Sequence, residues 1–452
     1  MSALSRLFRH DRAVYGWALY DWANSAFATT VMAGFFPIFF KSYWSAGVDA
    51  NTSTFWLGMG NSLAGLLVAL VAPFLGAIAD QGGARKRFLL FFAYTGVLMT
   101  AALFFIAKGA WGLAVVVYVI GTVGFSGANI FYDALLPLVA PKDKVDYISG
   151  FGFALGYLGG GVLFLINVLM TLFPAAFGLP DAATAVRWAF LTVALWWGGF
   201  TVFTIFWVKE TLPERKTVSG WRAVGRGWRE LKGTIAKFRH LRTLFTFLLA
   251  YWLYIDGVDT IIRMAVDYGL ALGFEDTDLI TALLLVQFIG FPAAIIYAKL
   301  GERWGVRKAL FLGIFWYAGI TVFGMTMTSR IEFYLLAAAV GMVQGGLQAL
   351  SRSYFARFVP DGAAGEFFGF YNMIGKSAVV IGPILMGAVG LAARQILGDP
   401  SMSPEELAAV SQTATRIGIG AILILFLGGA LLLYRVDEAR GIREAAEFDH
   451  GR

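Results

Sequence analysis

Apolar segments long enough to cross a bilayer recur along nearly the whole chain, and they restrict it to a membrane-spanning fold. A helix needs about 20 apolar residues to span the hydrocarbon core. We count twelve such segments in the 452 residues, at 13–40, 54–79, 88–107, 110–139, 147–174, 187–208, 243–272, 278–299, 308–328, 331–358, 366–394 and 413–434. They are too long for barrel strands and show no period of two. The sequence therefore predicts an all-α polytopic membrane protein with twelve transmembrane helices.

Composition narrows the chemistry available inside the membrane. Charged residues make up 14% of the chain, against roughly 25% in soluble proteins. The absence of cysteine excludes disulfides and thiolate ligands. The three histidines, His10, His240 and His450, fall in segments predicted to be cytoplasmic, so intramembrane proton chemistry must use carboxylates. We expect no metal, no cofactor and no enzymatic activity, because the chain lacks metal ligands and a nucleophile–base pair.

Basic residues are distributed unequally between the two sides of the predicted membrane. Of the 36 Lys and Arg residues, 27 lie on the same side as the N-terminus and six on the other. This positive-inside bias predicts that both termini are cytoplasmic and that the protein lies in the inner membrane. The bias also explains the basic isoelectric point, so we expect no nucleic-acid partner. Arg6, Arg9 and Arg12 lead directly into the first span without the features of a cleaved signal peptide.

The longest polar interruption, residues 209–242, separates six spans in residues 1–208 from six in residues 243–452. Apolar residues recur in it at helical spacing between basic ones, which predicts an amphipathic linker helix lying on anionic lipid. A protein-binding site would have a similar pattern. A second short helix is predicted outside the membrane, where Ser403, Pro404 and Glu406 form an N-cap, N1 and N3 pattern before the twelfth span.

The two halves repeat several motifs at matching positions. The loop from Asp80 to Lys86 matches the loop from Glu302 to Lys308 in its acid, its glycine and its two basic residues. The remaining pairs are Asn129 with Gln348, Asp133 with Arg352, Pro141 with Pro360, Asp21 with Asp256, and Asn24 with Asp259. The sequence thus predicts two pseudo-symmetric six-helix bundles.

Charged residues inside the predicted spans are confined to spans one, four, seven, ten and eleven. They are Asp21, Asp133, Asp256, Asp259, Arg263, Asp267, Arg352 and Lys376. At roughly 3 kcal/mol each in lipid, the group would cost more than the 5 to 15 kcal/mol or so that stabilises a typical fold. They must therefore face a shared polar interior, although internal ion pairs without a ligand remain an alternative for each one. Asp133 and Asp267 lie near span ends, where that alternative is stronger.

These charges define a candidate site for a solute or a proton. The residues expected to line a central cavity are Asp21, Asn24, Asp256, Asp259, Arg263, Gln344, Gln348, Arg352 and Lys376. On span seven Asp256, Asp259 and Arg263 share one helical face, as do Gln344, Gln348 and Arg352 on span ten. By contrast, the glycines of span five are interpreted as helix packing; they are Gly152, Gly156, Gly159, Gly160 and Gly161.

The repeated loop resembles the signature loop of the major facilitator superfamily, and the chain as a whole resembles its vacuole-effluxer-like branch. The supporting motifs are YDWANSAF at 20–27, FYDALLP at 131–137, GFGFALGYLGGG at 150–161, GGLQALSRSYFARFVP at 345–360 and FFGFYN at 367–372. The branch includes autophagy-related vacuolar amino-acid effluxers and bacterial permeases. The resemblance implies that spans one, four, seven and ten line a cavity, with spans three, six, nine and twelve outside, and that the bundles rock in alternating access.

The resemblance also implies a conformational latch, in which Asp80 docks on span eleven and Arg85 engages Asp133. Its members are Asp80, Gly83, Arg85, Lys86, Asp133, Glu302, Gly305 and Arg307. Gln81 and Glu302 depart from the residues usual in the superfamily.

We therefore expect a monomeric secondary transporter for a small polar or zwitterionic solute such as an amino acid, coupled to protons. Carboxylates and basic groups in one low-dielectric cavity would bind the two ends of a zwitterion. One alternative is an exporter of amphipathic compounds or metabolite anions. Another is a membrane sensor or scaffold without flux. The lipid bilayer is the remaining expected partner.

Overall fold

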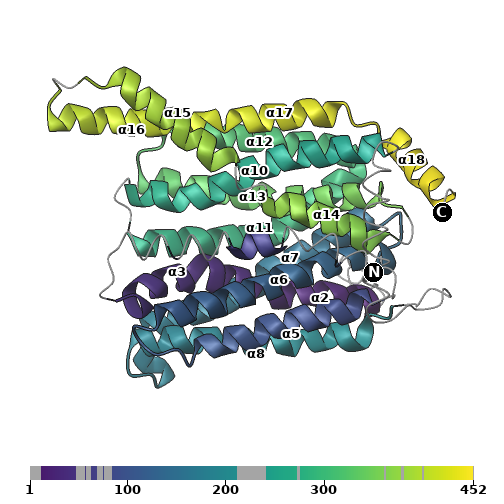
Figure 1. Cartoon of the computed structure of the whole chain (residues 1–452), viewed down its shortest axis with the longest axis horizontal. Coiled ribbons are helices and arrows are strands. Elements are labelled where there is room, and N and C mark those ends of the chain that lie inside the picture. The colour runs from purple at the N-terminus through teal and green to yellow at the C-terminus, as the bar shows by residue number, and fades with distance from the viewer. Residues whose placement is uncertain are drawn as a thin grey trace, which may run out of the picture. The chain divides into compact units, whose positions relative to one another are not determined.

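The computed structural model is helical throughout the part of the chain that it describes (Figure 1). That part comprises residues 12–46, 56, 63–68, 75, 84–210, 241–271, 275–360, 363–377, 381–399 and 402–450. Ten helices in it are long and apolar enough to cross a membrane. The all-α polytopic class is confirmed, and the ten helices accord with the twelve predicted. Predicted span 54–79 and the linker helix of 209–242 fall mostly outside the described residues.

The contacts of the chain define two compact units. Unit 1 comprises Met1–Lys237 and Val359–Met373, and unit 2 comprises Phe238–Phe358 and Ile374–Arg452. Unit 1 therefore contains the predicted first bundle together with a segment of predicted span eleven. That segment includes most of helix α14, Ala364–Ser377.

Unit 1 is built from long helices. The first span starts as α2 (Arg12–Ala26), continues as π-helix over Phe27–Phe35, and ends with α3 (Phe36–Phe39) and a π-helical turn, Phe40–Trp44. The other helices are α5 (Arg85–Leu103), α6 (Trp111–Val139), α7 (Val145–Leu172), the 3-10 turn Pro174–Phe177 and α8 (Ala182–Trp207). Helix α2 packs on α7 and α8, and α5 packs on α6 and α8.

Glycines of α7 form the contact with α2. A Cβ added at Gly156 would lie 2.7 Å from Ser25 Oγ, and one added at Gly159 would lie 2.4 Å from the backbone oxygen of Trp22. Only glycine allows the two backbones to approach this closely. The interpretation of this glycine face as helix packing is confirmed.

Unit 2 repeats part of this packing. Its helices are α10 (Arg242–Ala271), α11 (Asp276–Trp304), α12 (Val306–Thr326), α13 (Arg330–Ala356), α15 (Ile381–Leu397), α16 (Pro404–Ala421), α17 (Leu423–Tyr434) and α18 (Glu438–His450). Helix α10 packs on α17, and α12 packs on α13. In both halves the first span thus packs on the last and the third on the fourth, which agrees with the sequence repeat.

The predicted helix start at Ser403 is confirmed, but the helix is longer than expected. The Ser403 hydroxyl accepts the backbone N–H of Glu406, and the Glu406 carboxylate accepts that of Ser403 at 2.8 Å. The helix does not stop before the twelfth span. It runs on to Ala421, directly ahead of α17, so one capping box starts the whole final span.

Burial differs between the helices in the pattern that the resemblance implies. In the most apolar stretch of each helix, 67% of residues are buried in spans one and four and 61% in spans seven and ten. The share is 28% in span three, 39% in span six, 44% in span nine and 50% in span twelve. Spans one, four, seven and ten, which carry seven of the eight intramembrane charges, are thus more enclosed by protein than spans three, six, nine and twelve, as the cost of exposing charge to lipid requires.

Candidate functional site

Polar side chains of α2 and α6 meet inside unit 1. Asn24, which is 2% exposed, donates from Nδ2 to Asn129 Oδ1 at 2.6 Å. The Tyr132 hydroxyl donates to Asp21 Oδ2 at 3.2 Å, and the Ser25 hydroxyl lies 3.5 Å from Asp21 Oδ1. We call these five residues the unit 1 polar cluster. It brings together Asp21 and Asn24, which the sequence analysis singled out, with partners on predicted span four.

Aromatic rings hold Tyr132 in place beside Asp21. The Trp17 indole stacks on the Tyr132 ring at 4.4 Å with an interplanar angle of 11°. Its N–H donates to the Tyr132 backbone oxygen at 2.9 Å, and the Tyr20 ring lies 5.3 Å from that of Tyr132. Sequence reasoning missed Trp17 and Tyr132 as site residues. Tyr132 adjoins Asp133 within the motif FYDALLP, which was the one available signal.

In unit 2, Asp256 is fully buried and has three internal donors. The backbone N–H groups of Ile381 and Gly382 each donate to its carboxylate at 2.9 Å, and the Thr260 hydroxyl donates at 3.2 Å. Asp259, one turn further along α10, is partly buried. The two acids of span seven therefore occupy different environments.

Helix α13 carries the polar stripe predicted on span ten. Arg352 is 3% exposed, and Gln344 and Gln348 are half-buried. Among the described residues Gln344 Oε1 has no hydrogen-bond partner. A buried acceptor of this kind is one that a solute donor could satisfy. The side chains of the two other predicted cations, Arg263 and Lys376, lie outside the described part of the structure.

The signature loop of the first half ends in a reciprocal helix-capping arrangement. The Glu210 carboxylate accepts the first two N–H groups of α5, from Arg85 at 3.0 Å and from Lys86 at 3.1 Å. The Lys86 ammonium donates to the backbone oxygens of Ile205 and Val208, at 2.6 and 2.7 Å, near the end of α8. An anion thus caps a helix start and a cation a helix end, which is electrostatically favourable. Asp80 and Gly83 lie outside the described residues.

Asp133 is joined to predicted span eleven within unit 1. It is 8% exposed, and its Oδ2 accepts the Asn372 amide at 3.0 Å. Asn372 also donates to the backbone oxygen of Phe368. The sequence analysis did not select Asn372, although the motif FFGFYN contains it.

The signature loop of the second half caps the corresponding helix of unit 2. Glu302 is exposed, and Gly305 adopts φ +89° between α11 and α12, a conformation that favours glycine. Arg307 donates to the backbone oxygen of Tyr434 and lies 5.6 Å over its ring. Lys86 and Arg307 therefore both bond the end of the last span of their half.

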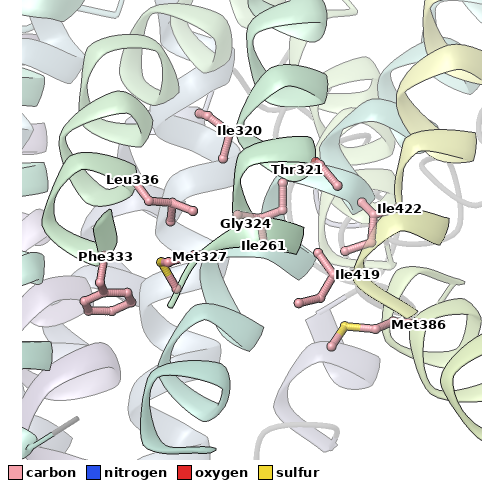
Figure 2. Close-up of a pocket in the computed structure, with 10 residues that line it drawn as sticks. All are labelled: Ile261, Ile320, Thr321, Gly324, Met327, Phe333, Leu336, Met386, Ile419 and Ile422. Atoms are coloured by element: carbon pink, nitrogen blue, oxygen red, sulfur yellow. The ribbon is translucent and has the colours of Figure 1, made fainter. Parts of the chain in front are cut away.

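A cavity of about 40 Å³ lies elsewhere in unit 2 (Figure 2). It is lined by Ile261, Ile320, Thr321, Gly324, Met327, Phe333, Leu336, Met386, Ile419 and Ile422. This apolar lining supplies no charge for a polar solute, and the volume is far below the 300 Å³ or so of a typical ligand site. Within the described residues, no group of three His, Asp or Glu side chains could hold a metal ion.

Comparison with known proteins shows what this architecture is similar to. Residues 9–396 match the model of the family described as vacuole effluxer Atg22 like. The uncharacterized MFS-type transporter YxiO of Bacillus subtilis is 39% identical over 95% of this chain and 96% of its own. Autophagy-related protein 22 of Yarrowia lipolytica is 25% identical over 76% of this chain and 72% of its own.

Solved structures show the same fold at low sequence identity. The human organic anion transporter MFSD10 aligns with a TM-score of 0.65 at 14% identity, over 93% of this chain and 99% of its own. The proton:xylose symporter XylE also aligns at 0.65, with 15% identity over 97% of both chains. The predicted major facilitator fold is confirmed.

Proposed function

Because the chain belongs to the vacuole effluxer Atg22-like family of MFS-type transporters, we propose that it carries a small zwitterionic solute, an amino acid, in exchange for or together with protons. It is a secondary transporter and not an enzyme. The observation that carries the proposal is the half-buried carboxylate of Asp21 among the aromatic rings of unit 1.

Asp21 is the proposed ligand of the solute ammonium group. Its side chain is partly exposed and accepts hydrogen bonds from the hydroxyls of Tyr132 and Ser25, which an ammonium can outcompete as a charged donor. The rings of Tyr20 and Tyr132 lie near it and add attraction between a cation and an aromatic face. Asn24 and Asn129 contribute uncharged amide groups to the same cluster.

The carboxylate of the solute is assigned to the basic residues of the second half. Arg352 is the strongest of these, because a guanidinium binds a carboxylate with two parallel hydrogen bonds. Arg263 and Lys376 are proposed as further cations. Gln344, with its unsatisfied oxygen, and Gln348 lie one and two turns from Arg352 on α13 and are proposed as polar contacts, together with Asp259 on α10.

Proton coupling is proposed to use the same acids. A carboxyl group that alternates between a solute ammonium and an apolar surrounding is drawn first toward its charged form and then toward its neutral form. Asp21 can therefore release a proton when the solute binds. The latch residues are proposed to hold one state of the cycle, with both termini in the cytoplasm of a monomer in the inner membrane.

Flux measurements in proteoliposomes test this proposal. A panel of 14C-labelled L-amino acids is offered to the wild type, Asp21→Asn and Asp143→Asn, the last being a control at an exposed carboxylate between α6 and α7. We expect wild-type flux to respond to an imposed pH gradient, Asp21→Asn to lose it at least tenfold, and Asp143→Asn to match the wild type. Wild-type flux that ignores the gradient would remove proton coupling. Flux of organic anions alone would favour the exporter alternative.

A further inference from the structure

The carboxylate of Asp256 occupies the start of a helix and not an open surface. Ile381 and Gly382 are the first residues of α15, and their N–H groups each lie 2.9 Å from one oxygen of Asp256. The Thr260 hydroxyl donates to the same side chain. Asp256 is 0% exposed, so these contacts are sealed within unit 2.

A helix that starts inside a bilayer needs acceptors for its first backbone N–H groups. The first N–H groups of any helix have no acceptor within the helix itself. Inside the hydrocarbon region no bulk water is present to accept them. A carboxylate is the strongest protein acceptor for this end, because its charge also opposes the positive end of the helix dipole.

The contact between α10 and α15 is built to exclude any larger side chain. A Cβ added at Gly382 would lie 1.9 Å from Thr260 Oγ1 and 2.7 Å from Asp256 Oδ1. Glycine at this position lets the amide reach the carboxylate. Gly382 and Thr260 are therefore parts of the same junction.

The equivalent acid of the first half, Asp21, does not lie at a helix start. Asp21 corresponds to Asp256 in the sequence repeat, but the span that packs beside it, α7, is one continuous helix from Val145 to Leu172. A continuous helix leaves no amide to cap at this depth, and Asp21 accepts hydrogen bonds from the hydroxyls of Ser25 and Tyr132. Asp21 and Asp256, although related by the sequence repeat, thus differ in the groups that donate to them.

We propose that Asp256 is a positioning residue, which fixes the start of α15 against α10, and that it does not bind the solute. Both carboxylate oxygens are engaged by backbone amides, so binding an ammonium there would uncover the helix start. Helices α10 and α15 then move as one element during transport. The part of this inference that concerns transport rests on the proposed function, whereas the capping role does not.

Hydrogen exchange measures the capping role without any substrate. Deuterium uptake at the amides of Ile381 and Gly382, measured on peptides that begin at least two residues before Ile381, is compared for purified wild type, Asp256→Asn, Asp256→Leu and Asp259→Asn. We expect uptake at the first two amides to accelerate at least tenfold in Asp256→Leu and by a smaller factor in Asp256→Asn, which keeps one acceptor oxygen. Asp259→Asn, on the same helix, should match the wild type. Unchanged uptake in both Asp256 variants would overturn the proposal.

Transport kinetics distinguish positioning from solute binding. The probe is the 14C-labelled amino acid that the wild type carries fastest, and rates are expressed per folded transporter. Asp256→Asn is expected to lower the maximal rate at least tenfold while half-saturation stays within twofold. A raised half-saturation with an unchanged maximal rate would make Asp256 a solute ligand and refute the inference. If the wild type carries no amino acid, the proposed function fails, and the exchange result still decides the capping role.

Discussion

The bond between Asn372 and Asp133 allows a direct test of how the segment Val359–Met373 is held against α6. Replacing Asn372 with leucine keeps the branched shape of the side chain but removes the donor that lies 3.0 Å from Asp133 Oδ2. Asp133 is 8% exposed, so little water can replace that donor. We expect the segment Val359–Met373 to detach from α6 more often as a result.

The size of the effect follows from the kind of bond. A hydrogen bond to a carboxylate contributes about 1.5 to 3 kcal/mol. Since 1.4 kcal/mol corresponds to a factor of ten, the population of the detached state should rise by about 10- to 100-fold.

The natural absence of cysteine allows this population to be measured by labelling. Ala364, at the start of α14, is 5% exposed, and Ala364→Cys would be the only thiol in the chain. Its labelling rate with a membrane-impermeant maleimide should rise about tenfold or more when Asn372→Leu is added. The matched control is Asn167→Leu, which removes another buried amide of unit 1, one that accepts from Thr192 at 2.9 Å. An equal labelling rate with and without Asn372→Leu, or an equal rise in the control, would show that this bond does not hold the segment against α6.

Three further changes test other parts of the structure. Glu210→Ala removes the acceptor of the first two amides of α5 and should cost about 1 to 2 kcal/mol, visible as a lower thermal midpoint in detergent. Asp143→Ala, at an exposed carboxylate between α6 and α7, should leave that midpoint unchanged. Gly159→Leu would place a Cβ 2.4 Å from a backbone oxygen of α2 and should sharply reduce the yield of monodisperse protein. Gly199→Leu is the control, because Gly199 has open space around it, and it should keep that yield. Equal yields of the two variants would count against the glycine contact. Ser403→Ala should destabilise the start of α16 by about 1 kcal/mol and speed amide exchange at its first residues about fivefold. Ser42→Ala, which removes a hydroxyl in the first span, should leave amide exchange at the start of α16 unchanged.

The cost of charge inside a membrane is what allowed the sequence to select candidate site residues. The positions of Asp21, Asn24, Asp256 and Arg352 on the most buried spans follow from that cost alone. Residues such as Tyr132 and Trp17 carry no comparable signal. An aromatic side chain in an apolar span is ordinary, and only its stacking beside Asp21 distinguishes it from packing.

The contacts made by the proposed latch residues were less accessible to sequence reasoning. The sequence repeat drew attention to Lys86 and Arg307, yet it could not reveal that each bonds the end of the last span of its half. Asn372 was missed because a single amide in an aromatic helix has no pattern of its own. Its importance comes from a partner 239 positions away in the chain.

The amino-acid sequence by itself determined that this chain is a helical membrane protein, where its spans lie, which of them carry charge and that its halves are related. These properties depend on hydropathy and helical period, which are local. The tertiary structure alone decided what each charge does. Asp21 and Asp256 occupy equivalent positions in the repeat, but one lies beside a continuous helix and accepts hydroxyls, while the other lies at a helix start and accepts amides. The difference arises from the neighbouring helix, whose free N–H groups no sequence period records.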